Sequence, residues 1–364
     1  MEHDLSHFPT SLPLMFIYFF APVIAISALG TAITYFFRFT PAVATRLKSD
    51  HVLICGVGRT GKLLAETLKK NDVAVVGVDI GSPENYEDWR TEHKVPMIFG
   101  DFNSRTVLER AGAAKARSII FASGDDLANL EGVVAAYGWL QDEPGPIRLF
   151  WAHIANERLA NTARFIFETD SCLGIRYFDT YYIAAKNMVE KFFEEDIRSK
   201  INQINILGFG KFGRDLLEVL VHVAGTNADW SIQVVDIRDI ESHVQSVAKE
   251  LNVADRITFI NRSIQDLKLS GGKDKAFFLC TDDDIGNLTV SMILVKNLNC
   301  DHIYVRMAAW PMPAIADHLG ENSGITFFNI NELVVQGIKD LPGIFKPAKL
   351  IDIKRSKRAS ACDY

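Results

Sequence analysis

The same glycine spacing occurs twice in this chain, as GVGRTG at residues 56–61 and as GFGKFG at residues 208–213. Each copy follows an apolar run and opens a stretch with helical spacing of leucines. Glycines in such a loop permit a tight turn and close approach of the backbone to a phosphate, which the helix N-terminus attracts. A second apolar strand then ends on an acid, Asp79 in the first copy and Asp236 in the second. This order predicts two βαβ units of the dinucleotide-binding type.

The repetition extends well beyond the glycine loops. In the second half, AFFLCTDDDIGNL and GITFFN correspond to IIFASGDDLANL and GIRYFD in the first half, in the same order and at a nearly constant offset. Such self-similarity indicates an internal duplication. Strands that alternate with helices after a glycine loop predict a doubly wound parallel sheet. We therefore expect an α/β fold with two tandem Rossmann-like domains, at residues 50–180 and 204–345. A crossover connector helix at 181–203 would join them, and a basic, disordered tail would follow at 346–364.

The N-terminal region has a different character. Residues 12–37 contain no charged side chain, and as a helix they would be roughly 39 Å long, enough to cross a hydrocarbon core of about 30 Å. Basic residues follow this run, and the positive-inside bias then places the remainder of the chain in the cytoplasm. The prediction is one transmembrane helix at 12–37 in the cell membrane, with residues 1–11 outside and a linker at 38–49. A buried core helix or an exposed dimer arm is the alternative.

Charge and cysteine content exclude several classes of protein. The net charge is −6, whereas a nucleic-acid-binding protein favours a basic face. The five cysteines are odd in number and show no C-x-x-C spacing, which argues against a disulfide framework and for a reducing compartment. We expect no nucleic-acid partner.

Four motifs, taken together and in order, resemble those of RCK domains, the regulator-of-K+-conductance or Trk-type NAD-binding modules. They are the glycine loop with its basic fourth position, the acid that ends strand two, the GD before the third helix of the first half, and the D-D-x-x-N motif after strand four. The resemblance covers roughly residues 50–340. It implies binding of NAD(H), ATP, ADP or a cation, assembly into rings, and gating of an attached K+ channel or transporter.

From this resemblance we expect a regulatory subunit for potassium ion transport that is not an enzyme. A tetramer of the chain would form a ring of eight domains beside a pore subunit and membrane lipid. The amphipathic stretches at 181–200 and 330–341 are expected to provide exposed assembly and hinge surfaces.

The expected nucleotide-binding residues belong to the glycine loops, the acids that end the second strands, and the D-D-x-x-N motifs. The basic loop residues would reach a terminal phosphate, and the aspartates suit either helix capping or a divalent cation. No other metal site is expected. The residues are Gly56, Gly58, Arg59, Thr60, Gly61, Asp79, Asp101, Asp125, Asp126, Asn129, Gly208, Gly210, Lys211, Phe212, Gly213, Asp236, Asp283 and Asn287.

The two halves also differ from each other. Asn261 and Arg262 align by sequence with Gly100 and Asp101, and the first half has no arginine comparable to Arg306. The first half keeps its acid at this place, so we expect it to be the tighter nucleotide site.

A dehydrogenase is the alternative from another class. Tyr182 and Lys186 have the spacing of the catalytic pair in short-chain dehydrogenases, in which the lysine lowers the tyrosine pKa for proton transfer. Both lie in the connector stretch, away from the expected nucleotide crevice. Turnover of a nicotinamide cofactor would distinguish an NAD-dependent oxidoreductase from a regulatory subunit.

Overall fold

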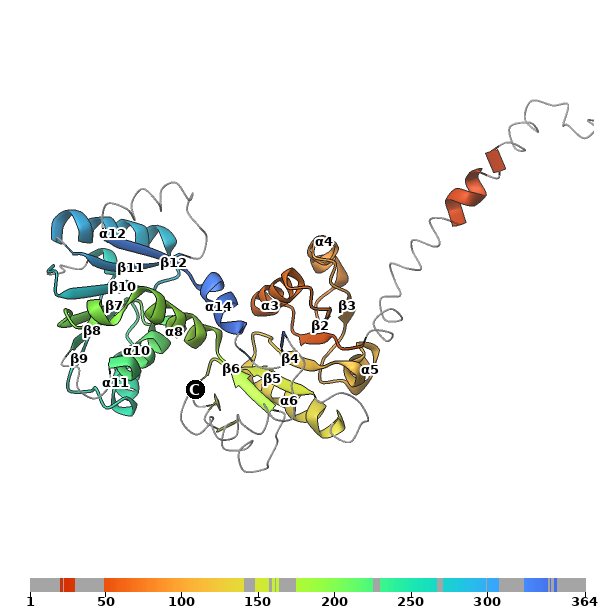
Figure 1. The fold of residues 1–364 in the computed structure, drawn as a ribbon, viewed down its shortest axis with the longest axis horizontal. Coiled ribbons are helices and arrows are strands. Elements are labelled where there is room, and N and C mark those ends of the chain that lie inside the picture. The colour runs from red at the N-terminus through yellow and green to blue at the C-terminus, as the bar shows by residue number, and fades with distance from the viewer. Residues whose placement is uncertain are drawn as a thin grey trace, which may run out of the picture.

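The computed structural model describes two α/β lobes and part of the N-terminal region (Figure 1). The description covers residues 20–21, 23–29, 49–140, 148–156, 159–160, 162–163, 175–224, 230–266, 271–298, 300–307, 324–339, 341 and 344–345. The predicted tail at 346–364 lies outside these residues.

The first lobe is built on a six-stranded parallel sheet in the order β3-β2-β1-β4-β5-β6. Its strands are β1 (Val52–Cys55), β2 (Val75–Asp79), β3 (Met97–Phe99), β4 (Ser118–Phe121), β5 (Leu149–His153) and β6 (Ile175–Phe178). Its helices are α3 (Arg59–Lys70), α4 (Glu87–Glu92), α5 (Arg105–Arg110) and α6 (Asp126–Leu140), with short 3-10 turns η1 (Pro83–Tyr86) and η2 (Ala113–Lys115).

The second lobe repeats this arrangement with the sheet order β12-β11-β10-β7-β8-β9. Its strands are β7 (Gln203–Leu207), β8 (Ser231–Asp236), β9 (Ile257–Asn261), β10 (Lys275–Leu279), β11 (His302–Met307) and β12 (Ile325–Asn329). Its helices are α10 (Lys211–Ala224), α11 (Glu241–Glu250), α12 (Asp284–Leu298) and α14 (Ile330–Ile338), with a 3-10 turn η3 (Ile264–Asp266).

The sheets explain why the strand sequences are apolar throughout. Every residue of β1, β2 and β4 is buried, because helices cover both faces of a doubly wound parallel sheet. In each lobe the first strand lies centrally, between the second and the fourth. The predicted duplication and the α/β doubly wound fold are confirmed.

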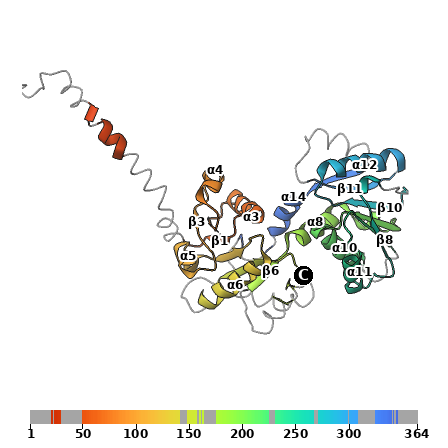
Figure 2. The same ribbon diagram turned by 180° about the vertical axis from the view of Figure 1, so that it is seen from behind.

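The linking helices α8 (Thr180–Phe192) and α14 lie between the lobes in both views (Figures 1 and 2). Helix α8 packs on α10 and α14, and α14 also contacts α3 of the first lobe. One apolar cluster therefore runs from the first sheet through both helices to the second sheet, and it includes Ile54, Met188, Leu333 and Phe278. The expectation of exposed assembly surfaces on these stretches is wrong for their apolar faces, which are buried between the lobes of the same chain.

The predicted single connector helix is interrupted. Helix α8 ends at Phe192, and a short helix α9 (Glu195–Arg198) follows before β7 begins. The break occurs at Phe193, which is fully buried in the second lobe and packs its ring edge-on against Phe278 and Tyr304. Burial of this aromatic ring in the second core stabilises the chain at the turn.

A buried arginine ties the end of the second lobe to the base of the first. Arg117 Nη2 donates to the carbonyl oxygens of Ile344 at 3.0 Å and Phe345 at 3.1 Å. Its Nη1 donates to Asp50 at 3.4 Å, at the entrance to β1. The C-terminal segment of the second half is thereby held beside the start of the first sheet.

Only part of the predicted transmembrane segment is described. Residues 20–21 and 23–29 are helical and exposed, and they lie well away from both sheets in Figure 1. Among the described residues, no helix has the length and apolar character needed to cross a bilayer. The rest of the predicted span at 12–37 lies outside the described residues.

Candidate functional site

The first glycine loop connects β1 to α3 and uses its three glycines in different ways. Gly56 has φ +87°, and a Cβ there would lie 2.5 Å from the backbone nitrogen of Ser123. A Cβ on Gly61 would lie 3.0 Å from the carbonyl carbon of Gly56, and still closer to its oxygen. A Cβ on Gly58, in contrast, would meet no heavy atom within 4 Å beyond its chain neighbours. The fold therefore requires glycine at positions 56 and 61, whereas Gly58 leaves the N-terminus of α3 open.

The second glycine loop reproduces this geometry between β7 and α10. Gly208 has φ +99°, and a Cβ on Gly213 would meet the carbonyl group of Gly208. Gly210 again has open space around it. The basic residues Arg59 and Lys211 begin the two helices and are exposed. Both loops thus present free backbone N–H groups and a positive charge, which together favour a phosphate.

The acid at the end of the second strand holds the glycine loop in the first lobe. Asp79 accepts hydrogen bonds from the backbone N–H groups of Val57 at 2.6 Å and Gly81 at 2.8 Å. Burial, followed by a hydrogen bond to Asp79, raises the pKa of Tyr86 to about 12. The carboxylate is therefore a structural acceptor as well as a candidate ribose ligand.

Asp236 is more heavily engaged in the second lobe. It accepts hydrogen bonds from Phe209 N at 2.8 Å and from Arg238 N and Nε, each at 2.9 Å. Arg238 Nη2 also pairs with Asp236 Oδ2 at 2.8 Å. Burial favours the protonated acid, but these hydrogen bonds from Arg238 and Phe209 outweigh it and lower the pKa of Asp236.

The D-D-x-x-N motifs serve the loops that follow β4 and β10. Asp125 Oδ1 accepts the N–H groups of Leu127 and Ala128, and Asp283 Oδ1 accepts that of Gly286, so both aspartates cap helices. Asn129 and Asn287 are fully buried. Their side-chain amides donate to the carbonyl oxygens of His153, the last residue of β5, and of Arg306, next to the last residue of β11. These asparagines hold adjacent strands together in the structure.

A cleft of about 630 Å³ lies over the carboxyl edge of the second sheet. Arg306 lies almost fully buried in its wall, where it donates to the carbonyl oxygen of Cys280 at 3.1 Å and pairs with Asp282 at 2.5 Å. The lining residues are Tyr181, Gly208, Gly210, Lys211, Phe212, Asp236, Ile237, Arg238, Ser263, Ile264, Gln265, Cys280, Thr281, Asp282, Asp283 and Arg306.

Six of the residues expected from the sequence line this cleft, while Gly213 and Asn287 pack behind it. Tyr181, Ile237 and Arg238 were not expected. Comparison of the two halves of the sequence could have identified Arg238, because Gly81 stands at its place in the first half. Tyr181 comes from α8 and has no local signal.

The first-half residues gather at the matching edge of their own sheet. Arg59 and Thr60 begin α3, and Asp79 ends β2. Asp101 is exposed and accepts the N–H of Asn103 at 2.9 Å. Asp126 turns instead toward the end of β5, where it accepts the N–H of Asn156 at 2.7 Å. Among the described residues, no cluster of three or more His, Cys, Asp or Glu is placed to hold a metal ion.

Strand register corrects one sequence alignment. Asp79 pairs with Phe99, and Asp236 pairs with Asn261. Arg262 N then donates to Asp236 O as Gly100 N donates to Asp79 O. Arg262 therefore takes the place of Gly100, and Ser263 takes that of Asp101. The alignment of Asn261 and Arg262 with Gly100 and Asp101 is wrong by one residue, because Asn261 is the last residue of β9 and corresponds to Phe99, the last residue of β3.

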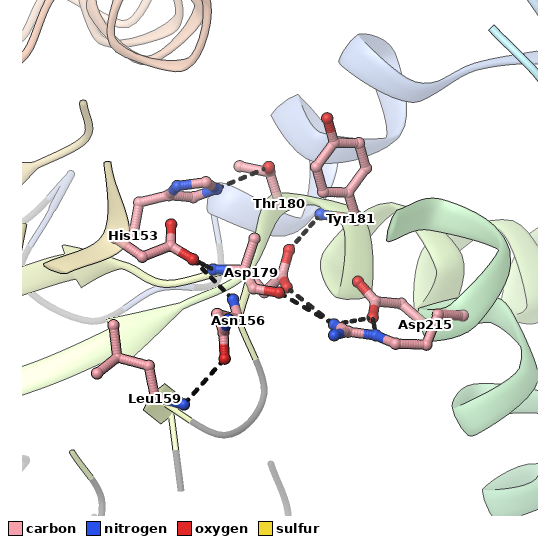
Figure 3. Close-up of polar contacts among 10 residues, drawn as sticks. His153, Asn156, Leu159, Asp179, Thr180, Tyr181 and Asp215 are labelled. Atoms are coloured by element: carbon pink, nitrogen blue, oxygen red, sulfur yellow. Dashed lines mark hydrogen bonds and ion pairs between the residues drawn. The ribbon is translucent and has the colours of Figure 1, made fainter. Parts of the chain in front are cut away.

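A polar cluster joins the two lobes beside the cleft (Figure 3). Arg214 on α10 donates through Nη2 to the carbonyl oxygen of Ala155 in the first lobe at 3.1 Å, and pairs with Asp215 at 2.5 Å. The same guanidinium lies 3.9 Å from Asp179, which caps α8 by accepting the N–H of Tyr181 at 2.7 Å. Tyr181, the α8 residue that lines the cleft, is thus hydrogen-bonded through its backbone to the cluster that joins the lobes.

Burial dominates the protonation of this junction. It raises the pKa of Asp179 and, together with repulsion from Asp179, raises that of Asp215 well above its ordinary value. His153 bonds Thr180 through Nε2 at 3.0 Å. Burial lowers the pKa of His153, and the positive charge of Lys211 lowers it further. The negative charges of Asp179 and Asp126 oppose this shift.

Comparison with known proteins gives a family match for part of the first lobe. Residues 52–158, which hold the first glycine loop and the first five strands, match the family model of the TrkA-N domain. Over 82 residues the chain is 32% identical to "Potassium channel protein 1" of Methanocaldococcus jannaschii. That alignment covers 22% of this chain and 25% of the relative, so the chain matches about a quarter of the relative's length.

Solved structures share the fold of both lobes. A crystal structure of GsuK bound to ADP matches with a TM-score of 0.53 at 14% identity, over 81% of this chain and 70% of that chain. The GsuK channel bound to NAD matches with a TM-score of 0.54 at 12% identity, over 94% of this chain and 74% of that one. At these identities the likeness concerns the fold alone.

Proposed function

We propose that this chain is a nucleotide-sensing regulatory subunit that controls potassium flux through a channel or transporter, without catalysing a reaction. The observation that carries the proposal is the open second glycine in each lobe. Gly58 and Gly210 have negative φ and no neighbour that a Cβ would meet, so neither backbone strain nor packing requires glycine there. Close approach of a phosphate to the backbone is a reason for glycine that remains.

The charge at each loop suits the phosphates of ADP, ATP or NAD(H). Arg59 and Lys211 stand at the first residues of α3 and α10, where the helix dipole adds positive potential. In the first lobe the strand-end acid Asp79 lies across the loop, where it would accept hydrogen bonds from ribose hydroxyls.

Exposed apolar side chains at matched positions suit a nucleobase. Ile80 and Ile237 directly follow the strand-end acids and are 79% and 71% exposed, respectively. Leu127 and Ile285 follow the first residues of α6 and α12 and are also exposed. Ile237 lines the cleft of the second lobe, where an exposed aliphatic side chain favours a flat apolar ring.

The link to potassium transport comes from the relatives. The name of the Methanocaldococcus jannaschii protein describes a potassium channel, and the GsuK structures carry ADP or NAD. The nucleotide would bind the chain's own lobes, and the lobes would bias the gate. Only different affinities for two arrangements of the lobes can transmit such a signal.

The two lobes share α8, α14 and the Asp179–Arg214–Asp215 cluster, so a change at one cleft has a packed route to the other lobe. We further propose that residues 12–37 anchor the chain in the cell membrane with both lobes on the cytoplasmic side, and that a tetramer forms a ring of eight domains. Carbonate extraction of membranes tests the anchor, since release of the intact chain would exclude a spanning helix.

Isothermal titration calorimetry on the full chain in detergent tests nucleotide binding directly. We expect ADP, ATP, NAD+ or NADH to bind, and Gly58→Val together with Gly210→Val to abolish that binding without loss of folded structure. Unchanged affinity in the double variant would refute the proposal. Steady oxidation of NADH with any carbonyl substrate would instead favour the oxidoreductase. Rubidium flux in vesicles from cells expressing the chain, with and without nucleotide, tests the regulatory step.

A further inference from the structure

Arg238 covers the acid that the second lobe would offer to a ribose. Its Nε and Nη2 form a two-point pair with the Asp236 carboxylate, and its own backbone N–H bonds the same group. With the N–H of Phe209, these bonds make four to a carboxylate, which has about four acceptor positions. Asp236 therefore has no acceptor left for a ribose hydroxyl while Arg238 stays in place.

The first lobe lacks this cover. Gly81 occupies the place of Arg238, and only its backbone N–H reaches Asp79. Asp79 accepts that bond and the N–H of Val57, two bonds against the four of Asp236 among the described contacts, so it retains more acceptor capacity than Asp236. The two strand-end acids are equivalent in sequence but differ in what they can accept.

Three matched positions shift the charge of the second cleft in the same direction. Arg238 stands for Gly81 and Arg262 for Gly100, as their backbone bonds to the strand-end acids show. Ser263, which lines the cleft, then stands for Asp101. Each replacement adds one positive charge or removes one negative charge at the edge where the ribose of a bound nucleotide would lie.

Arg238 also has donors left for an anion. Its bonds to Asp236 and to the carbonyl oxygen of Phe209 use Nε and Nη2. A guanidinium has five N–H donors, so both Nη1 donors stay available among the contacts of the described residues. The side chain is 57% exposed and lines the cleft, where a phosphate oxygen could reach it.

We propose that Arg238 makes the second cleft selective for an adenine nucleotide with a phosphate on its ribose, while the first lobe takes the free diol. The proposal rests on the proposed function, because it assumes that the phosphate at the glycine loop and the ribose at the strand-end acid belong to one nucleotide. An arginine beside that acid is the general means by which such folds accept a ribose phosphate, and its planar fork suits phosphate geometry.

AMP and adenosine 2′,5′-bisphosphate test this directly, because they differ only in the ribose phosphate. Calorimetry would use the full-length Gly58→Val chain, in which the first loop is blocked. We expect the bisphosphate to bind about tenfold tighter than AMP, which corresponds to about 1.4 kcal/mol. Arg238→Gly, which copies the first lobe, should remove this preference and improve AMP binding. Arg262→Ala removes an equal charge at the same edge from a residue outside the cleft lining, and should lower the preference much less than Arg238→Gly does.

The outcomes separate this inference from the proposed function. Equal or tighter binding of AMP to the Gly58→Val chain would overturn the role of Arg238, even though nucleotide binding itself would stand. A loss of preference in Arg262→Ala as large as that in Arg238→Gly would also overturn the role of Arg238. Absence of binding of either nucleotide to the unmodified chain would refute the nucleotide-sensor proposal as well. If Gly58→Val fails to fold, the same two nucleotides are titrated into the unmodified chain and into Arg238→Gly. We then expect the unmodified chain to show a site that prefers the bisphosphate, and Arg238→Gly to lack it.

Discussion

Single methyl groups at the first glycine loop should separate a packing role from a ligand-binding role. In Gly61→Ala, the new Cβ would lie 3.0 Å from the carbonyl carbon of Gly56 and 3.4 Å from Ile54 Cγ2, and would overlap the Gly56 oxygen. These neighbours belong to the backbone or to the core and move little. Overpacking of this kind costs about 1–3 kcal/mol, whereas alanine in place of glycine stabilises a helix by about 1 kcal/mol. For a clash at the upper end of that range, we expect the free energy of unfolding to fall by about 2 kcal/mol.

Gly58→Ala is the matched control on the same loop. Its φ is −73°, and nothing lies within 4 Å of the added Cβ. Its stability should stay within about 0.5 kcal/mol of the unmodified chain, while the larger Gly58→Val should lose nucleotide binding in the first lobe.

Thermal unfolding followed by tryptophan fluorescence gives the comparison. A loss of about 2 kcal/mol lowers Tm by roughly 4–8 °C in a lobe of this size, so Gly61→Ala should melt that much earlier and Gly58→Ala should not. Equal melting of Gly61→Ala and the unmodified chain would refute the packing argument. A large loss in Gly58→Ala would show that the second glycine is structural, and would remove the observation on which the nucleotide site depends.

Three further predictions concern single side chains. Asp79→Asn replaces one acceptor oxygen that holds the glycine loop, so it should cost about 1–3 kcal/mol in chemical unfolding and weaken nucleotide binding by roughly 10- to 150-fold; unchanged affinity in calorimetry would exclude a role in binding. His153 is buried with a lowered pKa, so the unfolded chain takes up a proton first as pH falls below about 6.5 and the folded state loses stability. Between pH 7.5 and 5.5, the Tm of His153→Gln should therefore fall less than that of the unmodified chain, and an equal fall in both would contradict this. Arg117→Met leaves the carbonyl groups of Ile344 and Phe345 without their donor, so the C-terminal segment should exchange its amide hydrogens faster; unchanged exchange would show that Arg117 does not hold it.

The local part of this protein could be predicted from its sequence. Strand, glycine loop, helix and strand-end acid depend on residues close together along the chain, through hydrophobic spacing, helix capping and the conformations open to glycine. The duplication made the second lobe as readable as the first, and the parallel α/β architecture followed from it. Asp125 and Asp283 cap helices where their position before α6 and α12 indicates.

Tertiary structure decided what those local units do with one another. The sequence could not show that Arg238 fills the acceptors of Asp236, that α8 brings Tyr181 into the cleft, or that Arg117 reaches the C-terminal segment. Strand register moved the counterpart of Asp101 to Ser263 by one residue. Such contacts join residues that are remote in the chain or whose side-chain directions local spacing leaves open. They depend on register and on how helices cross the sheets, and these are fixed only when the whole core packs.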